Sequence, residues 1–488
     1  MTETLPHSPA ARRVPGPATR PGAFAAPTPR AAGPTSGLTT SRGAALYIGA
    51  LLGPGLLLLP GLAAAEAGPA SVLAWAGLLV LSGLFATVFG SLGRAFPSAG
   101  GVIGYVRAGL GARAGAVAGW SFLAGVITGA PVVCLIGAGY ITELTGGGRP
   151  LRALVAAALL LAVTALAAGG LRASATAQLL LVGLLLVVVV VAVAGSARWS
   201  HAANWTPFAP YGWPGVGHAA ATLMLSFVGW EAVAPLTTRF TDPARQLPRV
   251  IGCALVVTSV LYLGLAIVIV GVLGRGAGTS APLAALLRDA VGPAGTAVAA
   301  AAAVVLTLGA VNAYLTGATE MVAELTSSRR LPGPGPRPGP GPGRGPRPGL
   351  RLRRRHTGRF GATSAGRRGT ASTGRPAPRL LAAIAVSGLT LIPLYGAGLI
   401  SPAALVTLPT TLFLVVYLGC MTSAVRILRG PARLAAVPAA VIVAAVLAYC
   451  GWSLVAPVAV ILAVGLAGPL ARAARAGFPS RIGGFARR

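Results

Sequence analysis

Lysine is absent from the 488-residue sequence, so all 39 basic residues are arginine. A Walker A loop needs a lysine on the nucleotide phosphates, and a pyridoxal phosphate enzyme needs one for its Schiff base. Both classes are therefore excluded for this chain. Cysteine and histidine are scarce, with four of each, and neither CxxC nor HExxH spacing occurs. We therefore predict no zinc site, disulfide framework, metal or cofactor.

Acidic residues are also rare, with eight in the whole chain, and charged residues of both signs make up only 10% of the sequence. Hydrophobic residues make up 55%. A soluble core cannot hide that much apolar surface beneath a conventional polar shell, so the composition indicates a bilayer as the solvent. The fold class that we predict is an all-α integral membrane protein.

Long uncharged windows recur along the chain and are long enough to cross a hydrocarbon layer of about 30 Å as helices. We predict twelve transmembrane helices, at 44–65, 70–92, 115–144, 151–169, 176–195, 216–237, 249–273, 293–325, 379–396, 401–425, 433–450 and 453–470.

The arginines are distributed very unevenly between the two sides that this model defines. One side carries 34 of the 39, and the other carries Arg149, Arg152, Arg198, Arg275 and Arg288. By the positive-inside rule, the arginine-rich side is cytoplasmic. We therefore expect a multi-pass protein of the plasma or inner membrane with both termini in the cytoplasm.

Three segments are too polar, or too rich in proline and glycine, to pack as helices. Residues 1–42 contain no apolar run suitable for a signal peptide and predict a disordered cytoplasmic tail. Residues 327–378 predict a disordered cytoplasmic loop between helices 1–8 (43–326) and helices 9–12 (379–470), and 471–488 a second cytoplasmic tail.

The arginines of the 327–378 loop, within a net charge of +31, raise the question of a partner. Anionic lipid headgroups fit, at about 1 kcal/mol for each residue near the surface. RNA is disfavoured because aromatic residues do not alternate with the arginines, so no nucleic-acid partner is predicted. A tolerated insertion or a reading-frame error explains the segment equally well.

Two of the twelve spans contain glycine and proline near their centres. The first has Gly53, Pro54 and Gly55, and the sixth has Gly229 followed by Trp230 and Glu231. Such residues interrupt a helix and free backbone groups, which lipid cannot satisfy and which must therefore line a cavity or contact protein. Weakness in the first and sixth spans is what an inverted repeat of five plus five helices produces. Ordinary kinks healed by neighbouring helices are the alternative for either span alone.

The broken spans and the motifs around them resemble a known family. Gly53-Pro54-Gly55, then LGRAFPSAGG at 92–101, then SFVGWEA at 226–232 occur in order. This combination resembles the amino acid, polyamine and organocation superfamily, and within it the bacterial exporters of methionine and branched-chain amino acids. The resemblance implies the leucine-transporter fold, alternating access, and a substrate site between broken helices one and six.

Carried onto this sequence, the resemblance implies a set of site residues. The substrate-binding residues that it implies are Gly53, Pro54, Gly55, Leu225, Ser226, Phe227 and Gly229, and Glu231 is implied as the gating or proton-coupling residue. Asn312 is a polar residue in the middle of span eight, and its position predicts a further substrate-binding residue, with hydrogen bonding between helices as the alternative. Pro54 stands where relatives have Ser or Thr, and Leu225 where they have Trp. Both departures favour a compact aliphatic amino acid over a guanidinium.

The remaining acids are expected to be structural. Glu66 and Glu143 fall at span ends and predict interfacial positions, while Glu320 and Glu324 predict solvated or arginine-paired roles near the end of span eight. Thr241, Asp242 and Pro243 predict a capped helix start. For Glu231 itself, a permanent hydrogen bond to freed backbone is the alternative to proton coupling.

The function predicted from the sequence is secondary active transport of small aliphatic amino acids, proton-coupled or by exchange, rather than enzymatic catalysis. A transporter-like sensor or scaffold that signals through the arginine-rich loop is the alternative. The sequence leaves the direction of transport open, and both a monomer and a homodimer are compatible with it.

Overall fold

The computed structural model describes residues 39–96, 101–170, 175–232, 240, 242–327 and 378–476. The chain divides into two units, Met1–Gly37 and Leu38–Arg488, and all the described residues belong to the second. Most of them are helical, which confirms the predicted fold class. The α-helices are α1 (Thr40–Leu51), α2 (Leu59–Ala67), α3 (Ser71–Ala95), α4 (Gly101–Leu110), α5 (Ala112–Thr145), α6 (Arg149–Ala168), α7 (Ala175–Ser196), α8 (Gly212–Leu223), α10 (Pro243–Val268), α11 (Pro282–Val291), α12 (Ala294–Ser327), α13 (Pro378–Gly396), α14 (Pro402–Ile427), α15 (Pro431–Ala448) and α16 (Val455–Ala476).

Nine helical segments of the described chain are long and apolar enough to cross a membrane. The predicted count of twelve stays a prediction, because the first and sixth predicted spans are broken into short pieces and the uncharged part of α16 is shorter than a full crossing. α1 begins at Thr40 and α16 continues to Ala476, so both helices extend into segments predicted as tails. The 327–378 loop lies almost wholly outside the described residues.

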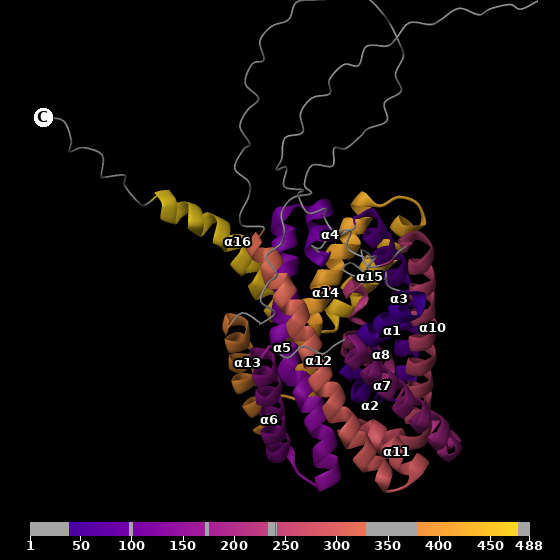
Figure 1. Cartoon of the computed structure of the whole chain (residues 1–488). Coiled ribbons are helices and arrows are strands. Elements are labelled where there is room, and N and C mark those ends of the chain that lie inside the picture. The colour runs from indigo at the N-terminus through magenta and orange to yellow at the C-terminus, as the bar shows by residue number, and fades with distance from the viewer. Residues whose placement is uncertain are drawn as a thin grey trace, which may run out of the picture. The chain divides into compact units, whose positions relative to one another are not determined.

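α5 lies at the centre of the helix packing. It is buried along most of its length and packs against α4, α6, α12, α13 and α14. Figure 1 shows α5 and α12 running side by side through the bundle. Glycines allow this close packing, because an added Cβ at Gly125 would lie 3.0 Å from the Phe413 ring on α14 and one at Gly137 only 2.4 Å from Thr307 Oγ1 on α12.

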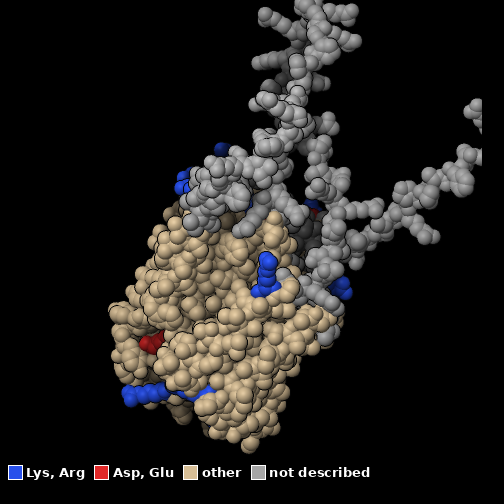
Figure 2. Space-filling model, turned by 90° about the vertical axis from the view of Figure 1, so that its left-hand side faces the viewer, with Lys and Arg blue, Asp and Glu red and all other residues tan. Residues whose placement is uncertain are grey.

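The outer helices present apolar side chains at the surface. Leu161, Leu180, Val260, Leu389 and Leu434 are all more than 65% exposed. The face in Figure 2 is correspondingly almost free of charged side chains over most of its area. Lipid is the natural neighbour for such a surface, because water would make its exposure costly. The protein is a multi-pass membrane protein.

Two short helices that the hydropathy pattern did not predict mark opposite ends of the bundle in Figure 1: α4 between α3 and α5, and α11 between α10 and α12. α4 packs on α5 and α14, and α11 packs on α7 and α12. We call these ends the α4 end and the α11 end.

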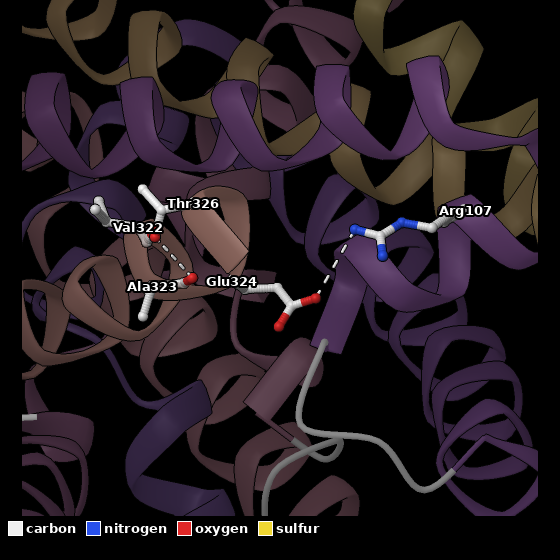
Figure 3. Close-up of polar contacts among 5 residues, drawn as sticks. All are labelled: Arg107, Val322, Ala323, Glu324 and Thr326. Atoms are coloured by element: carbon white, nitrogen blue, oxygen red, sulfur yellow. Dashed lines mark hydrogen bonds and ion pairs between the residues drawn. The ribbon is translucent and has the colours of Figure 1, made fainter. Parts of the chain in front are cut away.

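At the α4 end, Arg107 of α4 forms an ion pair with Glu324 near the end of α12, at 3.8 Å (Figure 3). This contact confirms the arginine-paired role predicted for Glu324.

The predicted cap before α10 is also confirmed. Asp242 is the N-cap residue, its side chain accepts a hydrogen bond from the Arg245 amide at 3.3 Å, and Pro243 is the first helical residue. The four cysteines lie singly in apolar sequence, a pattern that predicts small buried side chains. Cys134, Cys420 and Cys450 are buried as predicted, but the prediction is wrong for Cys253, which is exposed on α10.

Candidate functional site

The first break separates α1 from α2. α1 ends at Leu51, a 3-10 turn (η1, Pro54–Leu57) follows, and α2 begins at Leu59. Pro54 has no amide hydrogen and so cannot continue the α-helical hydrogen-bond ladder. The Gly53 amide instead donates to the Leu51 carbonyl at 2.9 Å, which turns the chain sharply. The glycine–proline pattern therefore produces the predicted break.

The second break separates α8 from the chain that follows it. α8 ends at Leu223, a 3-10 turn (η5, Met224–Phe227) follows, and Val228 is extended before a second 3-10 turn (η6, Trp230–Ala232). Between the two turns Gly229 adopts φ +143°, and an added Cβ there would lie 2.4 Å from the Ala50 carbonyl oxygen. Only glycine permits this backbone conformation and this approach to α1.

The two breaks lie against each other. An added Cβ at Gly55 in η1 would lie 3.3 Å from the Ser226 hydroxyl oxygen in η5. This hydroxyl is buried and has no hydrogen-bond partner among the described residues. Apart from its two chain neighbours, no described residue places a heavy atom within 4 Å of where a Cβ at Gly53 would stand. The junction therefore combines an unpartnered hydroxyl with open space beside a glycine.

Three tyrosines from the surrounding helices satisfy the polar groups that the breaks release. Tyr140 of α5 donates its hydroxyl to the Leu57 carbonyl at 2.6 Å. The Tyr262 hydroxyl of α10 lies 2.6 Å from the Leu51 carbonyl and 2.8 Å from the Ser226 carbonyl, so one side chain bridges both breaks. The third is Tyr417 of α14. Unwound backbone in a bilayer needs such partners, because lipid offers none.

Glu231 lies directly after the second break and is held from two directions. Its carboxylate accepts a hydrogen bond from the Gly229 amide at 2.9 Å and another from the Tyr417 hydroxyl. The Tyr417 oxygen in turn accepts from the amides of Gly229 and Trp230, at 3.0 and 3.1 Å. The carboxylate and the phenol thus form one hydrogen-bonded unit with the broken backbone.

Aromatic rings and one further hydrogen bond enclose the junction. Trp75, Phe227 and Tyr262 form a cluster with ring centroids 4.9 to 5.8 Å apart. The indole nitrogen of Trp230 donates to the Ser82 hydroxyl of α3 at 2.8 Å, which fixes the chain beside Glu231. Rings and backbone carbonyls around a small polar centre are typical of binding sites for small molecules.

The structure brings together most of the site residues that the sequence predicted. Gly53, Pro54 and Gly55 form the first break, and Leu225, Ser226, Phe227 and Gly229 form the second. Asn312 is half-buried on α12, a helix that packs against η1. The side chain of Pro54 lies outside the described atoms. That these residues bind substrate stays a prediction.

Sequence reasoning missed the three tyrosines. Each contacts a residue more than 80 positions away in the chain, and an isolated tyrosine in an apolar span gives no local signal.

The sequence also predicted that Glu66 and Glu143 both lie at the membrane interface. Glu143 is exposed, but Glu66 is half-buried and accepts hydrogen bonds from Thr222. No three His, Cys, Asp or Glu side chains of the described chain form a metal-binding group.

A polytopic helix bundle with two facing broken helices is an architecture typical of membrane transporters. The crystal structure of MhsT in complex with L-phenylalanine is similar to this chain, with a TM-score of 0.55 over 88% of this chain and 99% of that chain. Sequence identity is 17%, so this likeness shows the fold, which is that of the leucine transporter.

Sequence comparison then defines the family. A sequence profile described as "Amino acid permease" matches residues 38–333. The chain is 31% identical to the uncharacterized amino acid permease YecA of Bacillus subtilis, over 82% of this chain and 87% of that protein. It is 29% identical to the L-methionine/branched-chain amino acid exporter YjeH of Escherichia coli, over 80% and 86%. The chain belongs to the amino acid permease family and is a transporter rather than an enzyme.

Proposed function

We propose that the protein is a secondary active transporter of small aliphatic amino acids that works by alternating access. The observation that carries the proposal is the junction of the two breaks, where Gly55 lies against the Ser226 hydroxyl and the Tyr262 hydroxyl contacts the Ser226 carbonyl. Broken helices offer amide hydrogens to a carboxylate and carbonyl oxygens to an ammonium group. An amino acid carries both groups.

The apolar side chains around the junction favour an aliphatic substrate side chain. Its enclosing side chains are Trp75, Phe227 and Leu225, and all three are buried. Glu231 is the nearby carboxylate, and it is already engaged by Tyr417 and the Gly229 amide. An apolar substrate matches these surroundings better than a cationic one, because a cation would need an unengaged acid. The similarity to an exporter of methionine and branched-chain amino acids supports the same substrate class.

We propose that transport is coupled to protons through Glu231. If Glu231 does not titrate, amino acid exchange is the remaining transport mechanism. The carboxylate accepts hydrogen bonds from the Tyr417 hydroxyl and from the Gly229 amide, which belongs to the backbone of the second break. Protonation would remove the acceptor charge from these contacts. A proton can therefore favour one conformation of the break over another.

The experiment is flux of a panel of radiolabelled amino acids in proteoliposomes at two pH values, with equilibrium binding measured on the same preparation. We expect flux of leucine, isoleucine, valine or methionine and none of arginine. Arginine flux with no aliphatic flux would refute the substrate class. Specific binding without flux would favour the sensor alternative.

The proposed orientation places the α4 end in the cytoplasm and the α11 end outside. It follows the arginine distribution, since Arg94, Arg107 and Arg426 lie on helix ends at the α4 end. The test is antibody labelling of intact cells that carry an inserted epitope. An epitope near residue 205 should be accessible from outside, and one at residue 20 should be protected. An accessible epitope at residue 20 would overturn the orientation.

A further inference from the structure

A second carboxylate lies between the broken helices, on the opposite side of the junction from Glu231. Glu66 is in the last turn of α2, and Thr222 is in the last turn of α8. The Thr222 hydroxyl lies 3.0 and 2.9 Å from the two oxygens of the Glu66 carboxylate. Thr222 is 1% exposed, so the contact is shielded from solvent on that side.

The backbones of α2 and α8 also approach each other closely at this point. An added Cβ at Gly215 would lie 2.8 Å from the Glu66 carbonyl oxygen. α2 and α8, the halves of the two broken helices that lie toward the α11 end, are therefore joined by a backbone contact and by one carboxylate–hydroxyl pair. Any change in the charge of Glu66 acts directly on this joint.

The surroundings of Glu66 provide little positive charge. Neither ion pair recorded within the described part of the chain includes Glu66. His218, one turn before Thr222 on α8, is the facing basic side chain, and its ring packs on Tyr449 with centroids 5.6 Å apart. The other elements packed on α2 contribute the exposed Arg275 and the Tyr262 phenol, which is engaged at the breaks.

The Thr222 hydroxyl donates to Glu66, and a donor at this distance favours the ionised carboxylate. A change in the packing of α2 against α8 would move this donor and alter the exposure of the carboxylate to water at the same time. A group of this kind takes up or releases a proton when its surroundings open to water.

The position of Glu66 complements that of Glu231. Glu66 follows the end of the first break by eight residues, a helical rise of about 12 Å toward the α11 end. Glu231 lies in η6 after the second break, and η6 contacts α4. The two carboxylates therefore lie on different sides of the junction, Glu66 toward the α11 end and Glu231 toward α4.

We propose that Glu66 is a second proton-binding site of the transporter, reached from the α11 end, and that Thr222 is its positioning residue. The inference rests on the proposed transport function. Thr222 donates a charge-assisted hydrogen bond to the ionised carboxylate, and protonation replaces it with a neutral bond of roughly half the strength. Acid at the α11 end thus loosens the joint between α2 and α8.

The test uses the full-length protein in proteoliposomes of known orientation, with pH varied on the α11 side alone. Glu66→Gln keeps the acceptor for Thr222 but cannot bind the proton, so we expect the dependence of flux on α11-side pH to flatten. Glu143→Gln is the matched control, because Glu143 is an exposed carboxylate near the same end that accepts from the Ser280 hydroxyl at 3.2 Å. It should retain the wild-type profile.

Thr222 provides a second and milder perturbation. Thr222→Ser keeps the hydroxyl and should keep the profile. Thr222→Val removes the donor that favours the carboxylate, and we expect the midpoint of the α11-side profile to rise by about one pH unit. An unchanged midpoint in Thr222→Val would overturn the inference even if Glu66→Gln fails to insert.

A readout independent of transport separates this inference from the proposed function. In pH-difference infrared spectra of the purified protein, Glu66→Gln should lack a carboxylic-acid C=O band that wild type and Glu143→Gln both show. If wild-type flux is independent of pH but this band titrates, the proton site stands and the coupling mechanism fails. If Glu66→Gln retains the band and the wild-type flux profile, Glu66 is a permanent hydrogen-bond acceptor and the inference is refuted.

Discussion

Tyr262 offers a sharp test of the idea that buried tyrosines stabilise the two breaks. Its hydroxyl lies 2.6 Å from the Leu51 carbonyl and 2.8 Å from the Ser226 carbonyl, and the side chain is 1% exposed. Tyr262→Phe keeps the ring against Trp75 and Phe227 but removes the donor. A buried acceptor that loses its partner costs about 1–3 kcal/mol.

The matched control is Tyr47→Phe on α1. Tyr47 is 2% exposed, and its hydroxyl has no hydrogen-bond partner among the described residues. Removing an unpartnered buried hydroxyl relieves a desolvation cost, so this variant should be as stable as wild type or more stable. The two variants delete the same atom from equally buried rings and differ in what that atom contacts.

The assay is thermal unfolding of purified protein in detergent, followed by tryptophan fluorescence. We expect Tyr262→Phe to lower the apparent Tm by about 2–6 °C, taking about 2 °C per kcal/mol, the lower end of the range for domains of 150–250 residues. Tyr47→Phe should not lower it. Equal apparent Tm values for the two variants would refute the assignment of Tyr262 as the residue that stabilises both breaks.

Three further predictions concern the site and the arginine-rich loop. Glu231→Gln should still bind substrate but lose the pH dependence of flux, because glutamine cannot bind the proton in either conformation; retention of both rate and pH profile would make Glu231 a structural hydrogen-bonding residue. Gly53→Ala places a methyl group in open space, so the variant should fold normally but bind amino acids about tenfold or more weakly in a scintillation assay. The control is Gly77→Ala, on the exposed face of α3 and equally free of neighbours, which should bind as wild type does. Deletion of residues 333–374 should change flux in proteoliposomes by less than about twofold, since loop closure depends only logarithmically on loop length; loss of flux with normal insertion would show that the loop has a role.

Local sequence patterns were enough to predict the helical membrane fold and the positions of both breaks. Apolar windows define spans because their burial in lipid is independent of their neighbours. Pro54 and Gly229 act through their own backbone chemistry, by removing a donor in one case and by permitting φ +143° in the other. Such effects are encoded within a few residues.

The hydrogen bonds around the breaks were decided by tertiary structure. Tyr417 and Glu231 are 186 positions apart, Tyr262 and Leu51 are 211 apart, and Thr222 and Glu66 are 156 apart. Composition and periodicity carry no information about such pairs, because a hydroxyl in an apolar span can face any of several neighbouring helices. Glu66 illustrates the difference: its sequence position predicted an interfacial acid, and only the packing of α2 against α8 left it half-buried with Thr222 as a partner.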